Sequence, residues 1–139
     1  AAAFLRRSGA DTGDVKKLFQ NDLEGTIAKY DIIQTAKMYK SGIAVAKVDH
    51  TVGRITAAQA ADELLNISGI DTSFVLFPDN EGRVILSARS MGDVNVQVVL
   101  EKLGGGGNAA TAGAQVPNKT VDEVARMLFQ AIDQYLADE

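Results

Sequence analysis

The sequence predicts a single α/β (α+β) domain in which helices pack on a mixed β-sheet of about four to five strands. Three observations predict this class. Segments with apolar residues at helical spacing alternate with short apolar segments that are typical of buried strands. The 139 residues are 46% hydrophobic, which is enough for a core in one domain of this length. The chain has no cysteine, so neither disulfides nor cysteine-ligated zinc can hold the core together.

Helical spacing dominates the first part of the chain. A short helix is expected over residues 15–19, with Asp11 or Thr12 as its N-cap. Asn21 can cap a second helix. This second helix would carry an apolar stripe on one face, formed by Leu23, Ile27, Tyr30 and Ile33.

A strand and a third helix follow. Ser41-Gly42 ends the preceding helical pattern, and residues 43–48 predict a buried strand. Residues 55–69 predict a helix with Thr56 as its cap. One face of that helix has small residues that allow close packing on a neighbour, namely Ala57, Ala60, Ala61 and, at its end, the larger Leu64.

The middle of the chain predicts a hairpin. Residues 73–77 and 83–87 have strand patterns, and turn residues at 78–82 connect them. Residues 91–103 fit two patterns, because the valines alternate as in a strand and also recur at helical spacing. We predict a helix capped by Asp93, because the hairpin has just ended and the segment closes on a helix stop.

The last part predicts a strand and a final helix. Residues 109–116 are expected to form a strand of small residues, and residues 117–119 are expected to turn the chain. Thr120 and Glu123 have the spacing of a capping box. The helix that follows has one apolar face, formed by Val121, Val124, Leu128, Ile132 and Tyr135.

Charge and composition exclude several classes of function. The net charge of −4 argues against duplex DNA bound over a broad basic face, but a small phosphate ligand needs only a few groups. The longest apolar run is too short for a membrane helix. The only histidine, His50, is expected at the surface, and the acidic residues are too dispersed to predict a two-metal centre. The residues therefore predict a binding domain without chemistry of its own.

The four consecutive glycines, Gly104, Gly105, Gly106 and Gly107, form the first candidate site. A flexible tether is disfavoured, because too few residues follow for a second domain. Without side chains, several backbone N–H groups can converge on one anion. A plain loop or helix stop without a ligand fits the same residues, so both alternatives stay open.

The second candidate site is the segment Ser87-Ala88-Arg89-Ser90, expected in a turn between the hairpin and the next helix. A guanidinium there can make a bidentate contact to phosphate, with a hydroxyl on each side. A surface arginine beside a capping serine is the alternative, and these four residues alone do not exclude it.

Together these segments resemble a known family. The sequences SARSMGDVNVQ at 87–97, EKLGGGG at 101–107 and AGA at 112–114 resemble the C-terminal, DHH-associated domain of the DHH phosphoesterase superfamily. Within it they are most similar to the GdpP-type cyclic-di-AMP phosphodiesterases. Residues 1–11 also look like the junction between the catalytic DHH domain and a linker helix.

The resemblance implies a division of labour. It makes residues 1–40 a helical linker from a missing catalytic DHH domain, and residues 41–139 the DHH-associated substrate-binding domain. The catalytic domain would hold two Mn²⁺ ions. This chain would contain no cofactor, metal ligand or catalytic residue, and we expect it to be inactive alone. The substrate-binding roles fall on Ser87, Arg89, Ser90, Gly104, Gly105, Gly106, Gly107 and Asn108.

Asn108 departs from the family pattern, which has a histidine after the glycines. A histidine can carry charge or a proton, whereas an asparagine offers only neutral hydrogen bonds. Asn108 therefore either preserves a ligand contact or alters the activity or substrate of the parent protein.

The resemblance also implies partners and a location. The expected partners are a cyclic dinucleotide or a short oligonucleotide, the protein's own N-terminal DHH domain and a second copy in a homodimer, but not duplex DNA. The expected parent is membrane-anchored, with this soluble portion on the cytoplasmic face. Two alternatives remain, a substrate domain of a DHH exonuclease acting on short oligonucleotides and a non-catalytic nucleotide-binding module.

Overall fold

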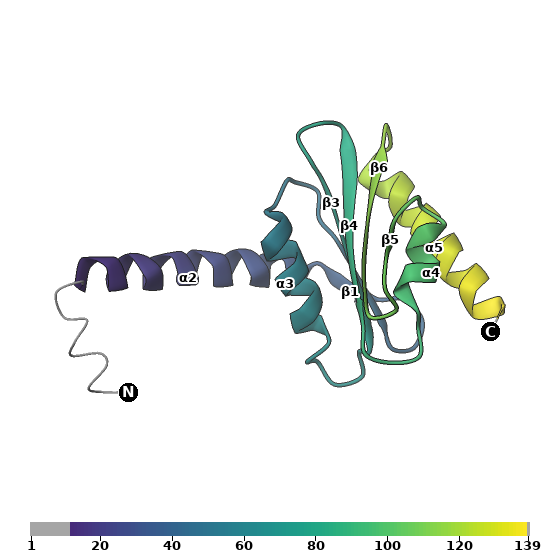
Figure 1. Cartoon of the computed structure of the whole chain (residues 1–139), viewed down its shortest axis with the longest axis horizontal. Helices are drawn as coiled ribbons and strands as arrows, with labels where there is room; N and C mark the ends of the chain where they lie inside the picture. Colours follow the sequence, from purple (N-terminus) through teal and green to yellow (C-terminus); the bar gives the residue numbers. More distant parts are fainter. Residues whose placement is uncertain (1–11, 139) are drawn as a thin grey trace.

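The computed structural model describes residues 12–138, with side chains from residue 23 onward. Helices cover both faces of one sheet, and the first helix extends away from it (Figure 1). The elements in chain order are α2 (Thr12–Gln34), β1 (Ala36–Met38), β2 (Ile43–Lys47), α3 (Arg54–Leu64), β3 (Thr72–Pro78), β4 (Arg83–Ser90), α4 (Val96–Glu101), β5 (Gly106–Gly107), β6 (Thr111–Pro117) and α5 (Val121–Ala137).

The sheet is mixed and has six strands in the order β1-β2-β3-β4-β6-β5. Strands β2 and β3 are parallel and are connected through α3, whereas the other neighbouring pairs are antiparallel. The predicted fold class is confirmed. The sheet has slightly more strands than the four to five expected; the two strands that no sequence segment predicted are the shortest, β1 and β5, and each lies at an edge of the sheet. Strand β1 lies within residues 1–40, which we had expected to be a helical linker.

Two apolar cores lie on opposite faces of the sheet, because successive residues of a strand point to opposite sides. In β4, Leu86 and Ala88 belong to the core under α4 and α5, whereas Ile85 belongs to the core under α3 and the end of α2. The predicted faces of two helices are buried as expected. They comprise Ala57, Ala60, Ala61 and Leu64 on α3 and Val124, Leu128, Ile132 and Tyr135 on α5.

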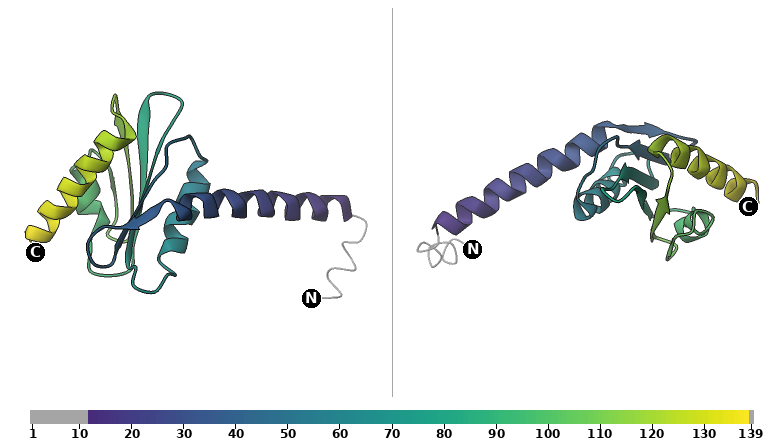
Figure 2. Two further views of the ribbon diagram at one scale, coloured as in Figure 1. Left: turned by 180° about the vertical axis from the view of Figure 1, so that it is seen from behind. Right: turned by 90° about the horizontal axis from the view of Figure 1, so that it is seen from above.

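Helix α2 differs from the prediction. One continuous helix replaces the two expected helices, so the break at Asn21 was wrong; the side chains proposed as N-caps, Asp11 and Thr12, lie outside the described residues. Three members of the predicted stripe do not pack, since Leu23, Ile27 and Tyr30 are 60%, 53% and 57% exposed, whereas the fourth, Ile33, packs against the core under α3. Figures 1 and 2 show why, because the helix runs beyond the sheet and only its last turns meet the body.

Two predicted N-caps are corrected by the structure. Residues 96–101 form a helix as predicted, but the cap is Asn95, whose Oδ1 accepts hydrogen bonds from the N–H groups of Gln97 and Val98. Asp93 instead lies before the cap. Helix α3 begins after Gly53 without a side-chain cap, so Thr56 lies inside the helix rather than at its start.

The capping box of α5 is confirmed. The Thr120 N–H donates to Glu123 Oε1 at 2.9 Å, and the Glu123 N–H donates to Thr120 Oγ1 at 3.1 Å. Tyr135 near the other end of α5 donates to the carbonyl oxygen of Asp93 and accepts from the N–H of Asn95. Helix α5 thus fixes the loop that follows β4.

Candidate functional site

The segment Ser87–Ser90 lies in strand β4 and not in a turn, so that part of the prediction was wrong. The strand continues because it has a partner on each side, with Arg89 opposite Thr111 on β6 and Ser90 opposite Thr72 on β3. The alternation of a strand then separates the predicted site residues. Ser87 and Arg89 face α3, whereas Ser90 faces the opposite side.

Arg89 is held by two hydrogen bonds. Its Nε donates to Asp62 Oδ1 on α3 at 2.9 Å, and an Nη1 hydrogen is donated to the carbonyl oxygen of Ala88 at 2.8 Å. The side chain is 17% exposed. A guanidinium has five N–H donors, so three remain for a ligand.

Ser90 is buried and lies away from the other candidate residues. Its Oγ is 3.5 Å from Thr72 Oγ1 and accepts a hydrogen bond from the N–H of Gly92 at 3.4 Å. The structure thus gives Ser90 partners within the sheet and the following loop.

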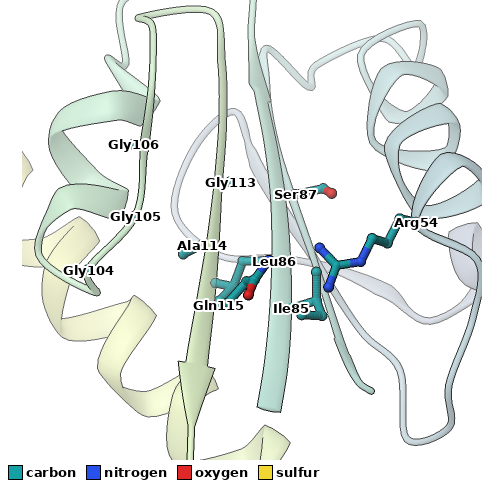
Figure 3. Close-up of a pocket in the computed structure, with 10 residues that line it drawn as sticks. All are labelled: Arg54, Ile85, Leu86, Ser87, Gly104, Gly105, Gly106, Gly113, Ala114 and Gln115. Carbon is teal, nitrogen blue, oxygen red and sulfur yellow. The ribbon is translucent and has the colours of Figure 1, made fainter. Parts of the chain in front are cut away.

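A groove of about 550 Å³ lies on the α3 side of the sheet, between α3 and the glycine segment (Figure 3). Its floor is formed by β4 and β6. Ser87 is opposite Gly113, and Gly113 is opposite Gly106, so one row of small residues crosses three strands on the same face. The groove is lined by Arg54, Ile85, Leu86, Ser87, Gly104, Gly105, Gly106, Gly113, Ala114 and Gln115.

The four positions of the glycine run differ in whether, and why, the backbone requires glycine there. Gly104 and Gly107 have φ values of 83° and 148°, which disfavour other residues. A Cβ on Gly105 would overlap the carbonyl oxygen of Gly113, because the two backbones approach closely there. Gly106 has neither constraint, since a Cβ there would meet no atom within 4 Å. Only Gly106, which lines the groove, has no such reason within the described part of the chain.

The N–H groups of the glycine run do not all face a ligand. Gly104 donates to the carbonyl oxygen of Glu101 at 3.1 Å, and Gly105 donates to that of Leu100 at 2.8 Å, so both close the end of α4. Gly106 and Gly107 form β5 rather than a free loop. The glycine run therefore gives the groove a wall of exposed backbone without side chains. It does not give the groove a set of converging N–H donors.

Asn108 builds the turn between β5 and β6. Its Oδ1 accepts hydrogen bonds from the N–H groups of Ala110 and Thr111, both at 2.9 Å. Its own N–H donates to the carbonyl oxygen of Thr111 at 2.7 Å. The side-chain oxygen is thus committed to the turn, and the amide NH₂ is the group left to meet a ligand.

Comparison with known families identifies the fold. The sequence profile of the DHHA1 domain family matches residues 40–138. The chain belongs to the DHHA1 domain family. The resemblance found from the segments 87–97, 101–107 and 112–114 is therefore confirmed.

Two curated relatives align with nearly the whole chain. The cyclic-di-AMP phosphodiesterase GdpP of Geobacillus thermodenitrificans is 43% identical over 137 residues, which are 97% of this chain and 21% of that protein. The cyclic-di-AMP phosphodiesterase PdeA of Listeria monocytogenes is 38% identical over 141 residues, covering 100% of this chain and 22% of that protein. The chain thus spans about a fifth of the length of these relatives.

A solved structure supports the fold. An exopolyphosphatase-related protein from Bacteroides fragilis matches with a TM-score of 0.70 and 21% identity, over 83% of this chain and 36% of that one. At this identity the match shows the fold of the DHHA1 domain and nothing about its ligand.

Sequence reasoning missed the two groove residues of this DHHA1 domain that have long polar side chains, Arg54 and Gln115. Arg54 was missed because the predicted start of α3 lay after it. The Gln115 Oε1 accepts a hydrogen bond from Arg83 Nη1 at 3.1 Å. Arg83 also donates from Nε to Asp79 at 2.7 Å, a bond that raises the pKa of the Arg83 guanidinium. Gln115 is therefore fixed by its carbonyl oxygen, which leaves its NH₂ group as a donor.

The described residues offer no metal centre. Among them, no group of three or more histidine, aspartate or glutamate side chains is placed to hold an ion. His50 is exposed, and its Nδ1 lies 3.1 Å from Asp49 Oδ1, a contact that lowers the pKa of the Asp49 carboxyl. The donor set thus does not fit a two-manganese site. None of the helices in residues 12–138 is long and apolar enough to span a membrane.

Proposed function

We propose that this DHHA1 domain binds the substrate of a cyclic dinucleotide phosphodiesterase, cyclic-di-AMP, in the groove between α3 and Gly104–Gly106. The observation that carries the proposal is the 43% identity to a cyclic-di-AMP phosphodiesterase over 97% of the chain. The aligned region spans the residues that line the groove as well as those of the core, which supports a related ligand.

The chemistry of the groove favours a phosphate ligand. Its lining contains one charged side chain, the guanidinium of Arg54, and no carboxylate, although the chain carries a net charge of −4. Hydroxyl and amide donors are available on Ser87 and Gln115. Arg89 lies beside the groove on the same face of β4, with N–H donors to spare. Arginine with neutral donors is a common arrangement for phosphate recognition.

The hydrolytic step belongs to a separate DHH domain in this proposal. Two Mn²⁺ ions there would supply an activated water, and residues 12–138 of this chain offer no ligand set for them. The task of the DHHA1 residues is to bind the phosphates and hold the nucleotide in one orientation, which lowers the entropic part of the barrier. The similarity to GdpP also supports a membrane-anchored parent with this domain on its cytoplasmic side.

Calorimetry of the chain with cyclic-di-AMP tests the proposal. We expect weak binding, because half of the substrate site lies in the other domain. Arg89→Ala should weaken it further. The chain alone should not hydrolyse cyclic-di-AMP in Mn²⁺ buffer. Turnover by the purified chain, or failure to bind cyclic-di-AMP under any condition that preserves the fold, would contradict the proposal.

A linear dinucleotide serves as the second arm of the experiment. Comparing the hydrolysis of cyclic and linear dinucleotides by the parent protein separates a cyclic-di-AMP phosphodiesterase from an exonuclease acting on short oligonucleotides. We expect the cyclic substrate to have the higher kcat/KM. The reverse order would favour the exonuclease.

A further inference from the structure

We propose that Arg54, at the start of α3, is a phosphate-contacting residue of this groove, separate from Arg89. This inference rests on the proposed function and adds a binding residue to it. Arg54 enters the groove from the wall opposite the glycine segment, and its guanidinium lies beside β4 at the level of Ile85 and Leu86 (Figure 3).

The guanidinium of Arg54 has no partner among the described side chains. No hydrogen bond or ion pair involves it within that part of the chain. Arg83 and Arg89, by contrast, are paired with Asp79 and Asp62 at 2.7 and 2.9 Å. Arg54 therefore keeps all five N–H donors available for an anion.

The position of Arg54 in the helix adds to its positive potential. It is the first residue of α3, where the helix dipole is positive, and a cation at this end is unfavourable. The first turn contains no acidic residue, and Gly53 provides no side-chain cap. The helix thus places a charge where it costs stability, and an anion in the groove would offset that cost.

The floor leaves room for a ligand beside Arg54. Ser87 and Gly113 present a hydroxyl and a bare backbone, and the hydroxyl of Ser87 has no hydrogen-bond partner among the described residues. On the far wall, a Cβ added to Gly106 would have no other atom within 4 Å, so there is free space beside this residue. An anionic group lying on this row of residues would meet the Ser87 hydroxyl from below and Arg54 from the side.

Arg54 and Arg89 lie at different levels of the groove. Arg54 reaches the level of Ile85, and Ile85 and Arg89 are four residues apart on β4, which is about 13 Å along a strand. The two arginines therefore occupy different positions along the groove. A cyclic dinucleotide carries two phosphodiester groups, so two separate arginines suit this class of ligand.

Calorimetry with cyclic-di-AMP on matched variants tests the role of Arg54. Loss of a charge-assisted hydrogen bond should raise the Kd for Arg54→Gln by about tenfold or more. Arg54→Lys should restore part of the affinity, because it keeps the charge but loses the fork geometry. Arg126→Gln removes the same charge from an exposed position on α5 and should leave the Kd unchanged. Thermal unfolding of each variant checks that the fold is intact.

The outcomes separate this inference from the proposed function. If the chain binds cyclic-di-AMP and Arg54→Gln binds it equally well, the role of Arg54 is overturned and the function stands. Pyrophosphate is a second probe. If it binds in an Arg54-dependent manner while cyclic-di-AMP does not bind, the proposed function fails and the role of Arg54 stands. If neither probe binds, both are overturned.

Discussion

The guanidinium of Arg89 on β4 is tied to the carboxylate of Asp62 on α3, with 2.9 Å between Nε and Oδ1. The pair joins the sheet to the helix that forms one wall of the groove. Arg89 is 17% exposed and Asp62 61% exposed, so the cation is shielded while its partner remains in water. The carboxylate orients Arg89 and also offsets its charge.

Replacing Asp62 by asparagine should tighten the binding of cyclic-di-AMP. Asparagine keeps an oxygen acceptor for Arg89 but removes the negative charge that competes with a phosphate. Because Asp62 is exposed, the free energy of unfolding should change by less than about 1 kcal/mol. Calorimetry at low salt measures the affinity, with Asp138→Asn at the end of α5 as the matched charge control. An unchanged or weaker affinity would contradict this prediction. It would mean that the orientation of Arg89 by the Asp62 carboxylate matters at least as much for binding as the competition between that carboxylate and the phosphate.

Alanine at Gly105 and at Gly106 should have opposite effects on fold and binding. A Cβ at Gly105 collides with backbone of β6, so Gly105→Ala should destabilise the domain by about 1–3 kcal/mol. A Cβ at Gly106 meets nothing, so Gly106→Ala should leave stability within about 0.5 kcal/mol or raise it slightly. The methyl group would project into the groove, however, and weaken the binding of cyclic-di-AMP.

Urea unfolding and calorimetry on the two variants provide the check. Gly25→Ala on α2 is the matched control for adding a methyl group, because Gly25 has open space around it and no positive φ. Gly82→Ala is unsuitable, because the φ of 78° at Gly82 would add strain. If Gly106→Ala bound the ligand with wild-type affinity, the ligand would not approach β5 closely.

Local patterns were sufficient for most elements but not for their pairing. The capping box of α5 and the small face of α3 depend on residues within a few positions, and both were predicted correctly. The extension of β4 to Ser90 depends on pairing with Thr72 and with residues of β6, which no local pattern shows. The site was therefore predicted as a turn, although its residues were chosen from their chemistry.

Arg54 shows the same limit for the site. Arg54 is a candidate binding residue only because it lines a groove together with Ser87 and Gly106. These residues are distant in sequence and are brought together by the order of β4, β6 and β5 in the sheet. An arginine at the start of a helix has no local signal for binding. Glycine is required at Gly105 but not at Gly106 because β6 approaches only the first of these closely. The sequence does not show that approach, so it could not distinguish the structural glycines of the run from the others.

Acid should destabilise the domain partly through the capping box of α5. The Glu123 carboxylate accepts a hydrogen bond from the backbone of Thr120 and, as the second contribution, one from its side chain; both lower the pKa of the Glu123 carboxyl from its ordinary value of 4.5. A lowered pKa in the folded state stabilises the protein above the unfolded pKa, and this contribution is lost as the pH falls through the folded value. Glu123→Gln keeps the reciprocal hydrogen bonds but cannot titrate.

The expected result is a smaller loss of stability below about pH 4.5 in Glu123→Gln than in the wild type, measured by urea unfolding across the acid range. Thr120→Ala removes the cap itself and should cost about 1 kcal/mol near neutral pH. Equal acid slopes for Glu123→Gln and the wild type would mean that other carboxylates, such as Asp122 with its pKa lowered by Lys47, account for the acid dependence.

Tyr39 should ionise only at very alkaline pH. Its hydroxyl donates to Asp133 at 2.7 and 2.8 Å, and its ring stacks on Phe129 with 4.3 Å between centroids. Burial, then the hydrogen bond to Asp133 and its negative charge, raise the pKa of Tyr39 from 10.0 to about 12. A pKa raised in the folded state stabilises the protein fully below the unfolded pKa, and this contribution is lost as the pH rises from about 10 to about 12.

The ultraviolet titration of the wild type minus that of Tyr39→Phe isolates this phenol from the other two tyrosines. The difference curve should have its midpoint well above the ordinary value near pH 10. Asp133→Asn should move that midpoint back toward 10, because it removes the charge that opposes ionisation. A midpoint near 10 in the wild type would mean that the Tyr39–Asp133 hydrogen bond is not maintained in solution. The contact between Tyr39 and α5 would then depend on the ring stack with Phe129, beside the ion pair of Lys40 and Asp133.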